Sequence, residues 1–323
     1  MSTKPAQPLT SKTFSELGVT KKTVVSIPPQ TTIENALKTM VRDSAFKTNN
    51  KLKPKKATNN VLTLPITSRA FPNKYVYILS TLDILLYVVS RQKAGGSLDL
   101  TATVESAMTM DAEQESYRVF ERDYRDTIES TMLQFTQGLH RALITDALKT
   151  QPPIVLTQTD ILSYIHKNIC FKQKDKSILS LPCFGKTLAE LGFVTNSVKG
   201  IREDESALDG FRKMAKGKVL AVPVLDKAGI LVGTLSAEDL RGLSGETIGF
   251  VGETVVEFLN KMKTKSEQTV SLTPSDTLMD AINVLVEKDV HRLWIVDSML
   301  RPIGVCSQSD VIAAILGVAV AKV

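Results

Sequence analysis

One pattern occurs four times in this 323-residue chain and limits what it can fold into more than any other feature. Each copy has an apolar run, a turn, a second apolar run and a hydroxyl-x-x-Asp motif that opens a helical pattern. The copies are "YVYILSTLDILLYVV", "PIVLTQTDILSYI", "ILVGTLSAEDLRGL" and "PIGVCSQSDVIAAIL", with Asp83, Asp160, Asp239 and Asp310 at intervals of 77, 79 and 71 residues. Spacing this regular predicts four structural repeats.

An amphipathic helix precedes the motif in the first, third and fourth repeats, and a less regular one, "DTIESTMLQFTQGL", in the second. The apolar faces consist of Ile33, Leu37, Met40 and Val41, then Leu208, Phe211, Met214 and Ala215, and then Leu278, Ile282, Leu285 and Val286. Two β-rich runs stand between helix and motif, so each unit predicts the order strand–helix–strand–strand–helix over about 60 residues. A unit of that size is marginal alone, and we expect the units to pack in pairs.

Composition narrows the class of protein. The length allows about two domains of ordinary size, and 43% hydrophobic residues predict a folded chain. No apolar run approaches the roughly 18 residues of a membrane span. The N-terminus "MSTKPAQPLTSKTF" has no signal-peptide core, and we expect residues 1–10 to be disordered. The expected compartment is the cytoplasm, with the nucleus as a second one.

The net charge of +6 comes largely from the tract "KTNNKLKPKKATNN" at residues 47–60. This tract predicts a basic, flexible insertion in the first repeat. A solvated loop is favoured over a nucleic-acid or phosphoinositide patch. Because no aromatic residues alternate with the basic ones, nucleic acid is not an expected partner.

The hydroxyl-x-x-Asp motif has two interpretations. It is an ordinary capping box for the helix that follows, and a single copy favours that interpretation. A carboxylate at a strand-to-helix junction can also accept hydrogen bonds from a ribose diol. The hydroxyls and backbone N–H groups at the helix start suit ribose and phosphate oxygens.

A recurring basic pair favours the ligand interpretation in two of the repeats. His140-Arg141 begins 20 residues before Asp160, and His291-Arg292 begins 19 residues before Asp310. Cations at the start of the preceding strand can neutralise phosphates through charge-assisted hydrogen bonds. The same pair at the same phase of two repeats indicates nucleotide contact there.

These repeats resemble CBS domains, which pair into Bateman modules. The resemblance covers roughly residues 11–319 and implies repeats at 11–93, 100–169, 185–244 and 250–319. "VPVLDKAGILVGTLSAEDLRGL" and "VHRLWIVDSMLRPIGVCSQSDVI" are further similar to the gamma regulatory subunits of AMP-activated and plant sucrose-nonfermenting-related kinases. The implied fold is an α/β protein of four CBS repeats in two Bateman modules, arranged as a disc whose clefts converge on its centre. The adenine would lie between strands.

The repeats differ in their candidate ligand residues. Repeat three has Gly217-Lys218 in place of the basic pair, and repeat one has Leu62 where a basic residue is expected. Glu238 beside the third aspartate would oppose a phosphate if it faced inward. The expected binding residues are Ser80, Asp83, His140, Arg141, Thr157, Thr159, Asp160, Lys218, Ser236, Asp239, His291, Arg292, Ser307, Ser309 and Asp310.

Repeat two departs from the animal gamma subunits that it resembles. In those proteins the second aspartate is typically replaced by a cation, and the site stands empty. Here Asp160 is present, and Thr159 stands where a phosphate-binding lysine is expected. The resemblance therefore leaves the occupancy of this site open.

No catalytic constellation stands out in the sequence. There is no nucleophile–base pairing, glycine-rich phosphate loop or metal motif. Cys170, Cys183 and Cys306 form no CxxC, which argues against a disulfide framework or zinc site, and Cys183 in "LPCFGK" is interpreted as a buried thiol. We expect a protein that is not an enzyme and needs no catalytic cofactor.

The resemblance implies an energy-sensing regulatory subunit that binds AMP, ADP or ATP. Its expected partners are a protein kinase catalytic subunit and a beta scaffold subunit. One alternative is a CBS-domain regulator of another enzyme that binds an adenosyl ligand such as S-adenosylmethionine. The other is a structural scaffold whose aspartates only cap helices.

Overall fold

The computed structural model describes residues 9–19, 24–40, 63–93, 100–108, 119–170, 181–241, 243–262 and 269–320. The basic tract at 47–60 and residues 1–8 lie outside these ranges, as do Val41 and Leu62. Leu9 and Thr10, which we expected to be disordered, belong to a short 3-10 helix, η1 (Leu9–Ser11).

Three of the four units have the predicted strand–helix–strand–strand order, followed by a helix. Unit two comprises β3 (Glu121–Asp123), α3 (Glu129–Thr136), β4 (Arg141–Thr145), β5 (Ile154–Thr157) and α4 (Gln158–Cys170). Unit three comprises β6 (Ile201–Arg202), α6 (Ala207–Gly217), β7 (Ala221–Leu225), β8 (Leu231–Ser236) and η5 (Ala237–Leu240). Unit four comprises β9 (Ser271–Leu272), α8 (Leu278–Glu287), β10 (Arg292–Val296), β11 (Pro302–Ser307) and α9 (Gln308–Leu316).

Unit one has the same arrangement with a reduced first strand. It comprises α1 (Ile33–Met40), β1 (Thr63–Thr67), β2 (Tyr75–Ser80) and α2 (Thr81–Lys93). Ile27 forms a single parallel bridge with Ile66 at the place of the missing strand. In the other three sheets the first strand pairs in parallel with the strand after the helix, which pairs antiparallel with the last one.

The last helix of unit three is shorter than the sequence predicts. Asp239 lies in the four-residue 3-10 helix η5, and Arg241 is already extended, at φ −64° and ψ 135°. The sequence continues Gly242-Leu-Ser-Gly245. A glycine costs about 1 kcal/mol relative to alanine inside a helix, so this sequence favours an early end.

Neighbouring units exchange the segments that precede them. Residues 9–19 pack on unit two, where Thr13 bridges Thr127, and residues 100–108 pack on unit one, where Thr103 bridges Thr32. Units three and four do the same, since Thr187 bridges Thr277 of unit four and Thr254 bridges Ser206 of unit three. The exchange ties unit one to unit two and unit three to unit four.

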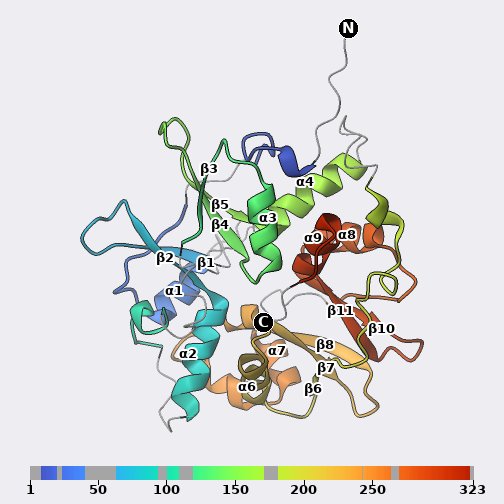
Figure 1. The fold of residues 1–323 in the computed structure, drawn as a ribbon. Coiled ribbons are helices and arrows are strands. Elements are labelled where there is room, and N and C mark those ends of the chain that lie inside the picture. Colours follow the sequence, from blue (N-terminus) through green and yellow to red (C-terminus); the bar gives the residue numbers. More distant parts are fainter. Residues whose placement is uncertain are drawn as a thin grey trace, which may run out of the picture.

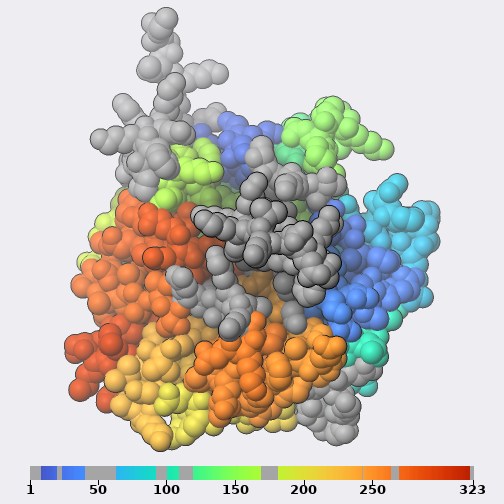
Figure 2. All heavy atoms as spheres, turned by 180° about the vertical axis from the view of Figure 1, so that it is seen from behind, coloured from blue at the N-terminus to red at the C-terminus, as the bar shows by residue number. Residues whose placement is uncertain are grey.

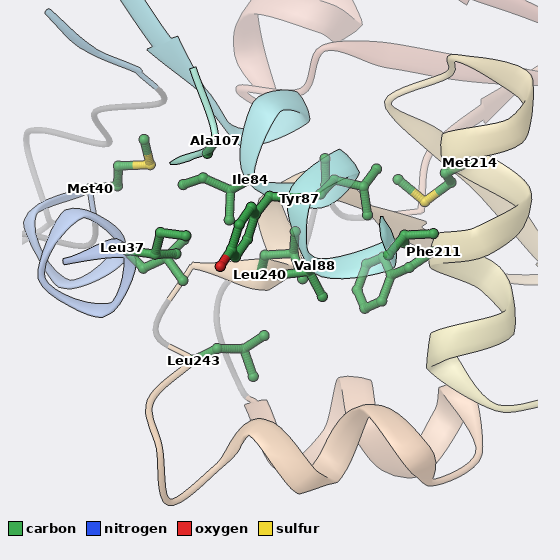
Figure 3. Packing of buried hydrophobic residues seen from close by; sticks show 14 of the residues in the cluster. Leu37, Met40, Ile84, Tyr87, Val88, Ala107, Phe211, Met214, Leu240 and Leu243 are labelled. Atoms are coloured by element: carbon green, nitrogen blue, oxygen red, sulfur yellow. The ribbon is translucent and has the colours of Figure 1, made fainter. Parts of the chain in front are cut away.

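Two apolar cores join the units in a different combination. One core combines units one and three, and the other combines units two and four. In the first, Phe211 and Met214 point from α6 toward α2 (Figure 3), and Phe211 meets Phe258 edge-on at 5.6 Å between ring centroids. Phe258 belongs to α7 (Val255–Met262). In the second, α3 and α4 pack against α8 and α9.

The four units surround the centre of the molecule in the order one, two, four, three (Figure 1). Seen from behind, the first and fourth units again lie on opposite sides (Figure 2). Units three and four meet through their sheets, because Trp294 Nε1 donates to Thr234 Oγ1 at 2.9 Å and Leu231 N donates to Leu300 O at 3.0 Å. In each unit the last helix begins directly after the last strand, at Thr81, Gln158, Ala237 and Gln308.

Candidate functional site at the centre

The four motif aspartates are each the third residue of the helix that closes a unit, and each accepts two hydrogen bonds from its cap residue. The Oδ2 atoms of Asp83, Asp160 and Asp310 accept from the backbone N–H of the cap residue at 2.7 Å and from its hydroxyl at 2.5–2.7 Å. Asp239 accepts from Ser236 in the same way, at 2.7 and 3.2 Å. The cap residues are Ser80, Thr157, Ser236 and Ser307. The capping interpretation is thus realised in every unit.

Capping occupies one oxygen of each carboxylate and leaves the other to different partners. In unit one Asp83 Oδ1 accepts from the hydroxyl of Tyr77 at 2.8 Å. In unit four burial raises the pKa of Asp310, although its bonds to Ser307 and the charge of Arg292 act in the opposite direction. Burial therefore outweighs the two hydrogen bonds from Ser307 and makes the ionised Asp310 carboxylate costly.

Strand register places one residue of each unit directly opposite the cap hydroxyl. Arg141 pairs with Thr157, and Arg292 pairs with Ser307. The corresponding residues of units one and three are Thr63, opposite Ser80, and Ala221, opposite Ser236. Only units two and four therefore present a cation at this position of the described sheets.

Lys218, the candidate cation of unit three, lies three residues before that position. It is the C-cap of α6 and has the left-handed backbone angle φ 49°. The sequence comparison aligned Gly217-Lys218 with the basic pairs, whereas the register aligns Leu220-Ala221 with them. Lys218 corresponds in position to Gly138 and Asp289, which also have positive φ and lie three residues before Arg141 and Arg292.

The two basic pairs act on one another, although they come from units two and four. Burial lowers the pKa of His140 to about 4, with further contributions from the charges of Arg141, Arg292 and His291. Burial also lowers the pKa of Arg141 to about 10, against the effect of nearby carboxylates, which are those of Glu238, Asp83 and Asp160. Groups from all four units thus influence one central cluster.

Glu238 faces inward and pairs with two cations of this cluster. Its Oε1 lies 3.0 Å from His291 Nε2, and its Oε2 lies 2.9 Å from Arg241 Nη2. The side chain is 17% exposed. Burial opposes its ionisation, but the charges of His291, Arg241 and Arg292 prevail and lower the pKa of Glu238 to about 2. From the sequence we expected Glu238 to oppose a phosphate only if its side chain faced inward, and in the structure it does face inward.

Arg241 is a central residue that the sequence reasoning missed. Its side chain is 6% exposed, and its Nε also donates to the Glu238 carbonyl at 3.1 Å. The repeats carried a signal for it. The position two residues after the aspartate is buried and aliphatic in the other units, as Leu85, Leu162 and Ile312. An arginine at such a position indicates a special role.

Thr159 and Ser309, two candidate phosphate contacts, bond across the interface between units two and four. Gln158 Nε2 donates to Ser309 Oγ at 2.8 Å, and Gln308 Nε2 donates to Thr159 Oγ1 at 3.0 Å. The arrangement is reciprocal, because each unit supplies one amide and one hydroxyl. These residues hold the two helix starts side by side at the centre.

The remaining chemistry of the described residues is sparse. No group of three or more His, Cys, Asp or Glu side chains in the described ranges is placed to hold a metal ion. Cys306 is buried and Cys183 is half-buried, and burial raises the pKa of both thiols. No helix in the described part of the chain is long and apolar enough to cross a membrane.

Comparisons with known proteins agree with this architecture. The family model described as CBS domain matches residues 189–246 and 253–317. The SNF1-related protein kinase regulatory subunit gamma-like PV42a of Arabidopsis thaliana is 24% identical in an alignment of 342 residues that covers 95% of each chain. The 5'-AMP-activated protein kinase subunit gamma of Saccharomyces cerevisiae is 27% identical over 164 residues, which is 50% of this chain and 48% of that one.

A solved structure extends the similarity to all four units. Protein MJ1225 from Methanocaldococcus jannaschii superposes with a TM-score of 0.65 at 19% identity, over 93% of this chain and 99% of that chain. The chain therefore contains a CBS domain pair in its C-terminal half, and its overall fold is shared with protein MJ1225.

Proposed function

We propose that this CBS-domain protein is a non-catalytic regulatory subunit that binds an adenine nucleotide at its centre. The observation that carries the proposal is the meeting of two His-Arg pairs from different units with capped aspartates and one inward-facing glutamate. Packing alone does not account for so many charged groups in one place, because removing charges from water is costly. A phosphate ligand would use the cations through charge-assisted bonds.

The two kinds of central residue suit two parts of a nucleotide. Arg141 and Arg292 would hold phosphate oxygens. The carboxylates of Asp160 and Asp310 would accept hydrogen bonds from a ribose diol through the oxygen that capping does not use. The backbone between the strands would hold the base, as the CBS resemblance implies.

Sensing follows from charge. AMP, ADP and ATP differ in the number of phosphates, so they differ in how many central cations they neutralise. A ligand shifts a conformational equilibrium only by its difference in affinity for the two states. Contacts made by residues of several units provide such a difference, because a change at the centre moves units relative to one another.

A protein kinase is the proposed partner of this subunit, with a catalytic subunit and a beta scaffold subunit in a cytoplasmic complex. This part of the proposal rests on the names of the relatives, of which one is a gamma-like regulatory subunit over 95% of both chains. Regulation of another enzyme through S-adenosylmethionine is the alternative ligand chemistry. Complete capping of every aspartate favours a third candidate, a scaffold without ligand.

Calorimetric titration of the full chain with AMP, ATP, adenosine and S-adenosylmethionine tests the ligand. The proposal predicts that AMP and ATP bind more tightly than adenosine, because adenosine has no phosphate for the cations. Tighter binding of S-adenosylmethionine than of AMP and ATP would favour the alternative, a regulator of another enzyme that binds an adenosyl ligand. If none of the four compounds binds, the scaffold without ligand would be the remaining candidate function.

Affinity purification after crosslinking in the native cell tests the partner. The proposal predicts a kinase catalytic subunit and a beta subunit at stoichiometric amounts. Stoichiometric recovery of an unrelated enzyme, without any kinase, would overturn the kinase assignment while leaving nucleotide binding intact.

A further inference from the structure

The centre already contains an anion that the protein itself supplies. The carboxylate of Glu238 accepts from the side chains of His291 and Arg241, at 3.0 and 2.9 Å. The charges of Arg292 and Arg141 act on the same carboxylate. These are the donors and charges that a nucleotide phosphate would use. One carboxylate therefore stands among the proposed phosphate-binding groups.

This anion is particular to unit three. The residue before the motif aspartate is Leu82 in unit one, Thr159 in unit two and Ser309 in unit four. Glu238 and Arg241 together replace one uncharged and one aliphatic position of the repeat. Glu238 lies in η5 and Arg241 is the residue that follows this short helix, so unit three has an ion pair at positions where the other units have none.

The ion pair leaves a donor unused. Arg241 Nη1 is buried and has no hydrogen-bond partner among the described residues. A buried N–H without an acceptor is unfavourable, and a ligand oxygen would relieve that cost. The guanidinium can thus bind Glu238 through one nitrogen and an additional acceptor through another.

We propose that Glu238 determines ligand specificity at the centre, as a built-in competitor that a nucleotide phosphate must displace from His291 and Arg241. This inference rests on the proposed function, because it assumes that the central cations bind phosphate. Displacement has a structural consequence. Glu238 belongs to unit three and His291 to unit four, so a phosphate that takes the place of Glu238 breaks a contact between two units.

The competition is one between anions of different charge. Glu238 is ionised near neutral pH, since its surroundings lower its pKa to about 2. An uncharged ligand such as adenosine gains nothing from displacing it. A phosphate with two negative charges forms stronger charge-assisted bonds with the same donors and can replace it. The centre therefore selects for ligands of high negative charge.

Titration of E238Q with inorganic phosphate, AMP and adenosine tests the inference. Glutamine keeps the shape and hydrogen-bonding capacity but removes the competing charge. We expect phosphate and AMP to bind about tenfold more tightly than to wild type, and adenosine to bind equally. The matched control is E205Q, which removes the same charge from a glutamate of unit three that pairs with Lys213 at 2.8 Å. E205Q should match wild type.

The outcomes separate this inference from the proposed function. Binding of AMP by wild type and E238Q with equal affinity, or weaker binding by E238Q, would overturn the competition and leave nucleotide binding standing. Binding by E238Q alone would support the competition. Failure of both proteins to bind phosphate and AMP would overturn both ideas.

A stability measurement covers the case in which E238Q is too unstable to titrate. The midpoint of thermal unfolding should rise more steeply with phosphate concentration for E238Q than for E205Q, because ligand binding stabilises the folded state. Parallel rises in the two variants would overturn the competition.

Discussion

The interface between units two and four differs from that between units one and three at equivalent positions. In the first pair the helix starts present Gln158 and Gln308, whose amides donate to Ser309 and Thr159 of the opposite unit. In the second pair the corresponding first helical residues are Thr81 and Ala237. The helix starts of units two and four are thus linked by reciprocal polar bonds, whereas those of units one and three have no glutamine at this position.

The difference shows how one repeat serves two purposes. Units two and four keep an arginine opposite the cap hydroxyl, and they hold their helix starts in register through amide bonds. Units one and three have Thr63 and Ala221 there and share a large apolar core. We infer that phosphate binding belongs to the polar pair, while unit three of the other pair supplies the competing anion.

The largest expected effects test whether the two cores are equivalent in stability. Phe211 lies in the core of units one and three, Phe135 lies in the other, and both are 0% exposed. F211A and F135A should each lower the free energy of unfolding by about 3–5 kcal/mol, because each removes a buried ring and leaves a cavity. Denaturant unfolding measures both losses.

The control for these variants is F71A, since Phe71 is 66% exposed and should tolerate the change. A loss below about 1 kcal/mol in either core variant would contradict the packing described. A large loss in one variant alone would show that a single core carries the stability of the chain.

The next prediction concerns the pH dependence of stability and involves His140, which belongs to the pair of units two and four. The pKa of His140 is about 4 in the folded protein, below its ordinary value of 6.5. The unfolded chain therefore binds the proton more readily between these values, and stability falls as the pH falls from 6.5 toward 4. The loss amounts to at most about 3 kcal/mol.

H140Q removes this titration, so the free energy of unfolding should depend less on pH between 6.5 and 4.5. That window lies above the range in which Glu238 takes up its proton. Urea unfolding at several pH values measures the slope. An unchanged slope in H140Q, or a His140 resonance that titrates near 6.5, would contradict the buried central position.

The smallest expected effect tests the reciprocal amide bonds. Q158A removes donations from Nε2 to Ser309 Oγ at 2.8 Å and to Phe135 O at 3.2 Å. The loss of stability should be about 1–2 kcal/mol, because each bond contributes modestly and its partners are buried. A double-mutant cycle with S309A should give a coupling energy of about 1 kcal/mol. Additive losses would show that the two side chains do not interact.

Repetition in the sequence predicted much of this molecule. The period of the aspartates predicted four units, the amphipathic and β-rich runs predicted the strand–helix–strand–strand order, and the hydroxyl-x-x-Asp motif predicted that Asp83, Asp160 and Asp310 lie at helix starts. Local patterns succeed here because capping and amphipathic faces depend on residues close in sequence. The short helix at Asp239 was the exception, since glycines after Arg241 outweigh the helical pattern.

Contacts between units were beyond the reach of sequence reasoning. The apolar faces of the helices predict that these faces are buried, but they do not predict which unit each face packs against. The packing of unit one against unit three could therefore not be derived from the sequence. The roles of Thr159 and Ser309 changed for the same reason, because both bond to glutamines about 150 positions away in the sequence. Arg241 was detectable as a charge at an aliphatic position of the repeat.

The central claim is that Arg141 and Arg292 hold the phosphate of an adenine nucleotide. Calorimetric titration of R292A with AMP and adenosine tests it most directly, with R202A as control, since Arg202 is exposed and pairs with Asp204. The account predicts that R292A weakens AMP by about 1.5–3 kcal/mol, barely affects adenosine and melts like wild type, while R202A changes neither ligand. Equal loss of both ligands, or no loss of AMP, would show that the basic pair serves packing and that the motif only starts a helix.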